Sequence, residues 1–384
     1  MSLNIVAQAH LLSCNSLFAT GIGVPHEAPR NAQQSSTRNA RGKEGSDVID
    51  KVCPHPFERI YLGVEHATTC CPVWLDQAAY AYDASMPAEA WNHRAVVQLR
   101  ERLLNGDYSL CQNCPELGAG NAVRHPAEGL QHVMTAGPMR VIIANDWTCN
   151  LCCWSCRPDL IVEGSGPQHR IAKALAGLDA WAESLEHMSI LQSGEVLTSR
   201  PCIEWLAAFE PDKWPKLKIE LFTNGTLLAK RWPEIAAAHG RITRMLISVD
   251  AATPATYEHI RRGGRWEDVR SGLALARELR RAGRLPDGLQ LNFVVQPGNF
   301  REMLAFVDMS AEYEATEAHL AIMNTSWHDA RTFAPHDLRQ PNHPLRDKFV
   351  HAAELLAEQA KQSDSGPEIV AHTVWRAALG QWTI

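Results

Sequence analysis

The stretch Arg140-Val-Ile-Ile-Ala-Asn-Asp-Trp-Thr-Cys-Asn-Leu-Cys-Cys-Trp-Ser-Cys156 joins an apolar run to a loop with four cysteines. The apolar run has the length and the β-branched residues of a buried strand. In the loop, Cys149, Cys153 and Cys156 form a C-x3-C-x2-C triplet, and Cys152 is an additional thiol. Three thiolates on one loop can bind three irons of a cubane cluster and leave the fourth iron open for chemistry. A zinc knuckle and a redox dithiol are alternatives that the spacing also allows.

The composition describes an ordinary soluble protein, because 45% of the 384 residues are hydrophobic and 21% are charged. The formal charge of −6 gives no reason to expect nucleic acid as a partner. We expect no membrane association either, since no apolar run approaches the ~18 residues of a membrane span. The first residues lack the basic start of a signal peptide. Eleven cysteines in a chain without export are typical of metal ligands, so we expect a reducing, cytoplasmic location.

A second group of cysteines surrounds a predicted hairpin, whose strands are expected over residues 59–63 and 68–74, and a predicted helix over residues 91–104. The group consists of one cysteine before the hairpin, two adjacent cysteines at its far end and a distant C-x2-C pair, namely Cys53, Cys70, Cys71, Cys111 and Cys114. Four soft ligands fit a tetrahedral zinc ion or an iron–sulfur cluster, and spacing does not separate the two. A disulfide pair is the interpretation least compatible with the cytoplasm.

From residue 139 onward, predicted strands alternate with predicted helices. Strands are expected over residues 140–144, 189–195, 216–225, 242–250, 289–296 and 319–324, and helices over residues 169–188, 201–209, 229–238, 266–282 and 299–311. This alternation predicts an α/β fold with a parallel sheet and right-handed crossovers. Six units are too few to close an eight-fold barrel, so we expect a partial (β/α)6 TIM-like barrel. Polar and glycine residues gather at the carboxyl ends of most strands, where such barrels assemble their sites.

Four segments follow from these patterns. We expect a flexible leader over residues 1–50, a small cysteine-rich module over 51–120, the barrel over 135–330 and a C-terminal helical extension over 331–384. The leader is polar and lacks periodicity around residues 31–45. In the extension, residues 349–360 predict a helix and residues 367–384 a final strand and helix.

The sequence resembles the radical S-adenosylmethionine (SAM) superfamily and, within it, the branch with a SPASM or twitch auxiliary-cluster module. The C-x3-C-x2-C loop follows the first barrel strand, as in that family. Ser193-Gly-Glu195 stands at the place of the family's Gly-Gly-Glu motif, and Thr223-Asn-Gly-Thr226 is similar to its third-strand ending. Residues 247–264 are similar to the fourth strand of the branch and the loop that follows it. These matches occur in the right order on successive strand ends, which makes the resemblance specific.

This resemblance implies a 4Fe-4S cluster on the cysteine triplet, with SAM chelating the fourth iron. Reductive cleavage of SAM would then yield a 5′-deoxyadenosyl radical that abstracts hydrogen from a C–H bond of a peptide, or of a sugar-like or other small metabolite. The outcome would be oxidation, epimerisation or bond formation, as in oxidoreductases, epimerases and maturases of this kind. An electron donor such as a flavodoxin or ferredoxin is also implied. The alternative from another class is a non-enzymatic iron–sulfur or zinc protein, such as a redox sensor or an assembly factor.

The resemblance further implies that polar residues at the strand ends bind SAM, namely Ser193, Gly194, Glu195, Asn224, Ser248, Asp250 and Arg261. Glu195 would meet the ammonium group in a charge-assisted contact, and Arg261 would pair with the carboxylate through its planar fork. Arg262 replaces Arg261 if the register slips by one residue. For Asn224, turn formation at the strand end is an equally good interpretation. Gln296 and Asn324 are weaker candidates.

For the cysteine-rich module, the resemblance implies a second, auxiliary 4Fe-4S cluster on Cys53, Cys70, Cys111 and Cys114, with Cys71 as the substitute for Cys70. Structural zinc is the alternative. A cluster with four cysteine ligands would relay or accept electrons. The module precedes the barrel, whereas in the SPASM branch it usually follows.

Three further positions need an interpretation. The family usually has an aromatic residue just before the last cysteine of the triplet, where this chain has Ser155, and Trp154 comes one residue earlier. The aromatic shield of the adenine is therefore expected to be displaced. Cys152 is interpreted as a bystander. Cys202 could donate a hydrogen atom to a substrate radical, although a buried structural cysteine is the simpler interpretation.

Overall fold

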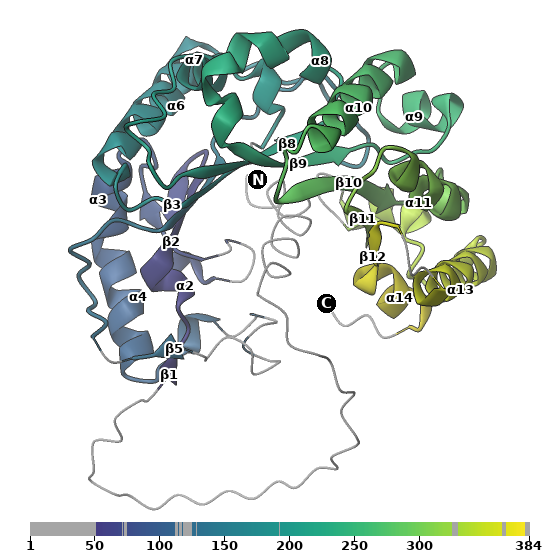
Figure 1. The fold of residues 1–384 in the computed structure, drawn as a ribbon. Coiled ribbons are helices and arrows are strands. Elements are labelled where there is room, and N and C mark those ends of the chain that lie inside the picture. Colours follow the sequence, from purple (N-terminus) through teal and green to yellow (C-terminus); the bar gives the residue numbers. More distant parts are fainter. Residues whose placement is uncertain are drawn as a thin grey trace, which may run out of the picture.

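The computed structural model describes residues 51–380 except 71, 73–74, 112–113, 115–116, 118–124, 128, 192, 325–328 and 363–365. The predicted leader and Cys71 therefore lie outside the described residues. The described chain forms a strongly curved, open sheet with most of its helices on the convex side (Figure 1). Within this part of the chain, no helix has both the length and the apolar composition needed to cross a membrane.

One sheet contains ten of the described strands, in the spatial order β12-β11-β10-β9-β8-β7-β6-β2-β3-β4. Its parallel strands are β2 (Arg59–Gly63), β6 (Arg140–Ala144), β7 (His187–Ile190), β8 (Lys218–Thr223), β9 (Ile242–Ser248), β10 (Gly288–Val295), β11 (Glu317–Ile322) and β12 (Glu368–Val370). Two short antiparallel strands, β3 (His66–Thr68) and β4 (Ala81–Tyr82), complete one edge. A separate antiparallel pair joins β1 (Lys51–Val52) to β5 (His125–Pro126).

The predicted α/β fold with a parallel sheet is confirmed, and the six predicted barrel strands correspond to β6 through β11. Two further parallel strands, β2 and β12, flank them, so the sheet is larger than a (β/α)6 unit. The predicted hairpin also exists, and its returning strand is β3 at residues 66–68; of the described residues in the predicted range 68–74, only Thr68 belongs to a strand. The other edge of β2 pairs in parallel with β6, which makes this strand of the cysteine-rich segment part of the barrel sheet.

Helices connect the strands and cover the convex side of the sheet (Figure 1). The longer ones are α4 (Arg94–Leu104), α6 (Ser165–Gly177), α7 (Arg200–Ala207), α10 (Trp266–Arg281), α11 (Met303–Glu312) and α13 (Arg346–Gln362). The shorter ones are α2 (His55–Glu58), α3 (Pro87–Trp91), α8 (Leu228–Arg231), α9 (Pro254–Ile260), α12 (Ala330–Phe333) and α14 (His372–Ala378).

Two predicted helices are shorter than expected. The helix expected over residues 169–188 is α6, which ends at Gly177 and is followed by a short 3-10 turn over Leu178–Trp181. The helix expected over residues 229–238 becomes α8 and a 3-10 segment from Trp232 to Arg241. Pro233 lies at the start of that segment and supplies no backbone N–H for a continuous α-helix.

The two faces of the sheet have different chemistry, because successive strand residues point to opposite sides. Outward-facing residues such as Val141, Ile143 and Met188 belong to the main hydrophobic core beneath the helices. On the concave face, a smaller apolar cluster consists of Tyr61, Ile142, Ala144, Leu191, Phe222 and Leu246. The carboxyl ends of the strands carry the cysteine loop and its neighbours, and the amino ends of β6 to β9 carry charged side chains. Along β6 to β8 the concave face is thus polar at both ends and apolar between them.

Candidate active site

The cysteine loop after β6 is fixed by backbone hydrogen bonds to two other segments. The N–H of Cys149 donates to the carbonyl of Ile161 at 3.0 Å, and that of Cys152 donates to the carbonyl of Arg262 at 2.9 Å. The Nε of Arg262 returns a bond to the carbonyl of Cys152 at 2.8 Å. Cys149, Cys153 and Cys156 are all free thiols, and Cys153 is buried.

The three thiols of the loop interact electrostatically. The pKa of Cys149 is raised to about 11, mainly by burial; Arg157 opposes this shift, and Glu195 and Cys156 contribute to it. Burial likewise raises the pKa of Cys153 to about 12, where Arg261 opposes the neighbouring thiolates. The thiolate is the form that binds metal, and three desolvated thiolates repel one another. The loop is therefore suited to a cationic metal centre that stabilises the deprotonated form.

Arg157 is a site residue that the sequence analysis missed. Its side chain is only 2% exposed, and its guanidinium donates to the carbonyls of Trp147 and Ser193, each at 2.7 Å. Burial lowers the pKa of Arg157, but Cys156 and Cys149 more than offset this and raise it. Arg157 thus ties the cysteine loop to the end of β7 and places a positive charge beside the thiolates. The only signal in the sequence was its position directly after Cys156.

The predicted motif Ser193-Gly-Glu195 lies against the segment that enters the cysteine loop. A Cβ on Gly194 would lie 2.0 Å from the carbonyl oxygen of Thr148, so only glycine permits this approach. The N–H of Glu195 donates to the same Thr148 carbonyl at 2.8 Å. The Ser193 hydroxyl donates to the carbonyl of Ala144, at the end of β6, at 2.8 Å. The motif therefore fixes the ends of β6 and β7 to each other.

Glu195 is 2% exposed, and its carboxylate already accepts three hydrogen bonds. Oε1 accepts from the N–H of Leu197 at 3.1 Å and from the hydroxyl of Thr223 at 2.7 Å, and Oε2 accepts from the N–H of Asn224 at 2.6 Å. Burial raises the pKa of Glu195, whereas these bonds lower it. A carboxylate offers roughly four acceptor sites, so Oε2 retains one for an incoming donor.

Asn224 connects the end of β8 to the cysteine loop. Its Oδ1 accepts from the N–H of Thr226 at 3.0 Å, which forms the turn that its sequence context allows. Its Nδ2 donates to Oδ1 of Asn150 at 3.0 Å, and Nδ2 of Asn150 donates to the hydroxyl of Thr226 at 2.9 Å. Asn150 was also missed in the sequence, where it is a polar residue between two cysteines.

Asp250 and Arg261 form a buried ion pair next to Cys153. Oδ2 of Asp250 lies 2.8 Å from Nη2 of Arg261, and Oδ1 accepts from the N–H of Val294 at 2.7 Å. Burial lowers the pKa of Arg261, but Asp250 and Cys153 raise it well above its usual range. Arg262 instead bonds the outside of the cysteine loop. Of the two arginines considered in the sequence, Arg261 is therefore the one inside the site.

Two buried donors near this edge have no hydrogen-bond partner among the described residues, namely Nε of Arg261 and Nε2 of Gln296. Unpaired buried donors are rare, and they suit a ligand with carboxylate or hydroxyl oxygens such as SAM. Ser248 is half-buried at the end of β9. Asn324 lies within 3.5 Å of Arg339, so its partner belongs to the C-terminal segment. The residues at this edge fit the group that the resemblance implies.

Trp154 packs against residues that come much later in the sequence. Its ring packs against His336 in a tilted arrangement with centroids 4.0 Å apart, and it contacts a small apolar cluster of Val294, Met323 and Phe333. Ser155 is buried in the position where the resembling family has an aromatic residue. Trp154 therefore attaches the cysteine loop to the C-terminal segment. Cys202, on α7, packs in the main hydrophobic core on the convex side of the sheet.

The second cysteine group gathers around one small apolar pocket, lined by Cys53, Cys70, Cys111, Cys114, His55, Leu75, Leu103 and Tyr108 among others. Burial raises the pKa of Cys53 to about 11 and of Cys111 to about 12, and Cys114 raises both. The N–H of Cys53 donates to the Tyr108 hydroxyl at 3.3 Å. Among the described residues, no three His, Cys, Asp or Glu side chains converge on a point suited to one metal ion. A cluster binds each thiolate through a different iron and does not need such convergence.

A parallel α/β sheet that gathers thiols, carboxylates and arginines at the carboxyl ends of its strands has the arrangement of an enzyme active site. Residues 148–308 match the family model described as the Radical SAM superfamily. A GTP 3′,8-cyclase from Peptoclostridium acidaminophilum is 31% identical over 182 residues, which cover 46% of this chain and 52% of that protein. The chain thus spans about half the length of this curated relative.

Solved structures with a similar chain course include SuiB of Streptococcus suis. With S-adenosylmethionine bound, SuiB is 17% identical, and the match covers 74% of this chain and 62% of SuiB with a TM-score of 0.44. With the precursor peptide SuiA bound, the values are 15%, 77% and 66%, with a TM-score of 0.42. The structure of anSMEcpe with bound AdoMet is 16% identical over 61% of this chain and 64% of that one, with a TM-score of 0.41.

Proposed function

We propose that this protein is a radical SAM enzyme that cleaves SAM reductively and abstracts hydrogen from a C–H bond of its substrate. The observation that carries the proposal is the convergence of the free thiols Cys149, Cys153 and Cys156 with the buried groups of Glu195, Asn224, Asp250 and Arg261 at one edge of the sheet. When bound, the cluster and SAM supply a 5′-deoxyadenosyl radical.

The residues of the chain have separate tasks in this proposal. The three thiolates hold the cluster, and Arg157 and Arg261 balance their charge. The open acceptor site on Oε2 of Glu195 receives the ammonium of SAM. The unpaired Nε of Arg261 donates to the carboxylate of SAM. Because Arg261 also pairs with Asp250, this ion pair fixes the guanidinium before SAM arrives.

The test is SAM cleavage by the full chain after anaerobic reconstitution with iron and sulfide. With dithionite as reductant, the protein should form 5′-deoxyadenosine, and Cys153→Ala should reduce the yield to background. Cys202→Ala is the matched control, because Cys202 lies in the main core on the other side of the sheet. No 5′-deoxyadenosine from the unaltered chain, or an equal yield from both variants, would refute the proposal.

We further propose that residues 51–120 form a SPASM/twitch-like module that holds a second 4Fe-4S cluster on Cys53, Cys70, Cys111 and Cys114. The shared pocket and the mutual charge effects of its thiols support this ligand set. A variant with alanine at Cys149, Cys153 and Cys156 should retain about four irons and a reducible cluster signal. Zinc without iron in that variant would contradict the auxiliary cluster.

For the substrate, we propose a small metabolite or a peptide that is oxidised, epimerised or joined at a carbon. The relative that is named for a reaction of GTP supports the small-metabolite class. A closed, four-cysteine cluster would accept the second electron of an oxidation, with a flavodoxin or ferredoxin as the external donor for SAM cleavage. Product analysis by mass spectrometry separates these outcomes, because oxidation lowers the substrate mass and epimerisation leaves it unchanged.

A further inference from the structure

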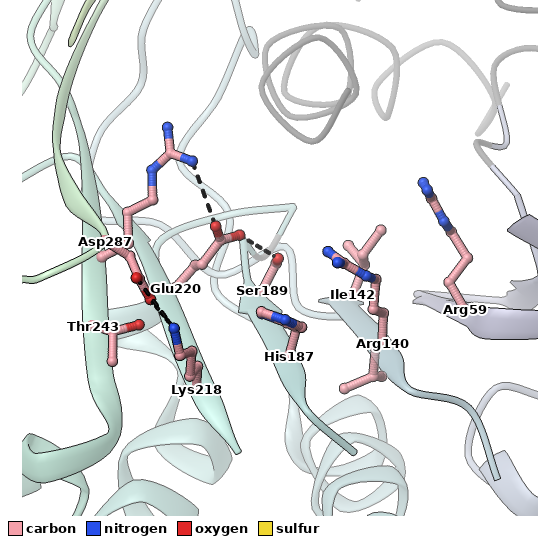
Figure 2. A pocket seen from close by; sticks show the side chains of 11 residues that line it. Arg59, Arg140, Ile142, His187, Ser189, Lys218, Glu220, Thr243 and Asp287 are labelled. Carbon is pink, nitrogen blue, oxygen red and sulfur yellow. Dashed lines mark hydrogen bonds and ion pairs between the residues drawn. The ribbon is translucent and has the colours of Figure 1, made fainter. Parts of the chain in front are cut away.

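The amino ends of the barrel strands, opposite the cysteine loop, surround a cavity of about 260 Å³ (Figure 2). Four basic residues, Arg59, Arg140, His187 and Lys218, are the first residues of β2, β6, β7 and β8. The strand register pairs Arg59 with Arg140, Arg140 with His187, and His187 with Lys218. These residues, here called the basic row, therefore stand side by side on strands that are about 4.8 Å apart. Like charges in facing positions destabilise a sheet unless something compensates them.

Two acidic residues of the cavity, Asp287 and Glu220, lie at the Lys218 end of the basic row. Lys218 pairs with Asp287 at 3.0 Å, and Glu220 accepts from the hydroxyl of Ser189 at 2.7 Å (Figure 2). Glu220 also lies 3.6 Å from Arg244, a buried residue. No carboxylate of the described residues lies within ion-pair distance of Arg140. Arg140 lines the cavity, and its positive charge has no carboxylate partner within the part of the chain that the structure describes.

His187 places an uncharged hydrogen-bond donor, its imidazole, beside the positive charge of Arg140. Figure 2 shows the two side chains on neighbouring strands, with Arg59 on the strand beyond Arg140. Burial, and then the charge of Arg140, lower the pKa of His187, so its imidazole is neutral at pH 7. A planar guanidinium beside an imidazole can donate several hydrogen bonds to one group of oxygens.

We propose that the basic row binds an anionic oxygen group of the substrate, a phosphate or a carboxylate, through Arg140 and His187. This inference rests on the proposed function and names the substrate class for the same barrel. Arg140 and Ala144 are the ends of β6, which places the anion site roughly 13 Å from the start of the cysteine loop. The substrate therefore carries its charge at one end and its reacting carbon at the other.

The anion site also adjoins the pocket of the second cysteine group. Nη2 of Arg59 lies 2.5 Å from Nδ1 of His55, and His55 lines the cysteine pocket while Arg59 lines the cavity. A substrate anchored in the cavity is thus separated from that pocket by one pair of side chains. This arrangement suits an auxiliary cluster that exchanges electrons with the bound substrate.

The proposal is tested by calorimetric titration of the reconstituted full chain with inorganic phosphate and, separately, with succinate, at constant ionic strength in chloride. At least one of the two anions should bind with one site per chain. Arg140→Gln should weaken that binding about tenfold or more, because it removes charge-assisted hydrogen bonds, and Arg140→Lys should weaken it less. Arg200→Gln is the matched control, since Arg200 is exposed on α7 at the convex side.

Binding of phosphate alone indicates a phosphorylated substrate, and binding of succinate alone indicates a carboxylate substrate. Binding of both indicates an unselective anion site. Each of these three results supports the proposal. Binding of neither anion, or equal weakening in Arg140→Gln and Arg200→Gln, overturns it. A second assay, SAM cleavage in the absence of substrate, distinguishes a failure of the anion site from a failure of the proposed function. Arg140→Gln should leave the rate of this cleavage unchanged. If the unaltered chain binds phosphate but cleaves no SAM, the proposed function fails while the anion site stands.

Discussion

At Gly194 the end of β7 and the segment before Cys149 approach so closely that a side chain has no room. The sequence analysis interpreted this glycine as a contact for SAM, through resemblance to a motif. The structure adds a reason that needs no ligand, because a Cβ would lie 2.0 Å from the carbonyl oxygen of Thr148. Backbone packing and cofactor binding thus make demands on the same residue.

Gly194→Ala should destabilise the protein by about 2 kcal/mol, because the strand end or the cysteine loop must move away. It should also lower the iron content after reconstitution. Gly166→Ala is the matched control, since a Cβ at Gly166 meets nothing within 4 Å and alanine favours the helix α6. The free energy of unfolding in urea and an iron assay measure both effects. Equal stability of the two variants would contradict the packing argument.

Single residues show how far the sequence could predict the site. Glu195, Asn224 and Asp250 were expected at strand ends. Asn224 and Asp250 closely follow β8 and β9, whereas β7 ends at Ile190 and Glu195 is the N-cap of the 3-10 turn that comes after it. Their partners were not predictable, because Thr223, Asn150 and Arg261 come from other loops and strands, and hydrogen bonds between distant segments leave no local pattern. Arg157 was missed for the same reason, since its acceptors are carbonyl groups on either side of the loop.

At the scale of elements, β9, β10 and β11 carry a buried polar ladder on the concave face. Arg244 pairs with Glu317 at 3.1 Å and donates to Gln290 at 2.7 Å, and Gln290 lies 3.0 Å from His319. Burial lowers the pKa of His319 to about 4, and His372 and Arg244 contribute to this shift. His319 is therefore neutral in the folded protein over a pH range in which the unfolded chain binds a proton.

The unfolding free energy should fall by about 2 kcal/mol between pH 7 and pH 5 because of His319 alone. The sign follows because the folded pKa is depressed below the unfolded value of about 6.5, so stability is lost as the pH falls through this window. Urea titrations at both pH values should show a smaller difference for His319→Gln than for the exposed control His351→Gln. An identical difference in the two variants would assign the effect to another group.

Strand identity was easier to predict than helix length or strand partners. Each strand from β6 to β11 carries apolar residues in a run that its local sequence reveals. The end of α8 depends instead on the missing N–H of Pro233. The pairing of β2 with β6 joins residues about eighty positions apart, and nothing in the hairpin sequence indicates a second partner.

At the scale of the molecule, the cysteine loop and the C-terminal segment are coupled through Trp154. The ring packs against His336 and Phe333, so residues of the C-terminal segment help to position the loop. An aromatic residue directly before Cys156 would occupy a different place. In the resembling family the aromatic residue comes directly before the last cysteine, whereas here it comes one residue earlier, at Trp154. This shift by one residue accompanies the contact of Trp154 with the C-terminal segment.

Trp154→Ala should lower the unfolding free energy by about 2 kcal/mol and should speed the loss of iron to a chelator. Trp375→Ala is the control, because it likewise removes a half-buried tryptophan, but one in the C-terminal region and not in the cysteine loop. It should lower stability without affecting the rate of iron loss, because Trp375 lies on α14 and not in the loop. Equal rates of iron loss from both variants would show that Trp154 only stabilises the fold.

The length of β6 has a consequence for selectivity. The charge of a ligand would be fixed beside Arg140, and the chemistry would occur at the loop beyond Ala144. The length of β6 therefore sets the distance between the charge of the substrate and its reacting carbon. A series of dicarboxylates or alkyl phosphates of increasing chain length should then show an optimum in hydrogen abstraction rather than a steady rise with hydrophobicity. The span of the optimal compound would correspond to roughly four strand residues, about 13 Å.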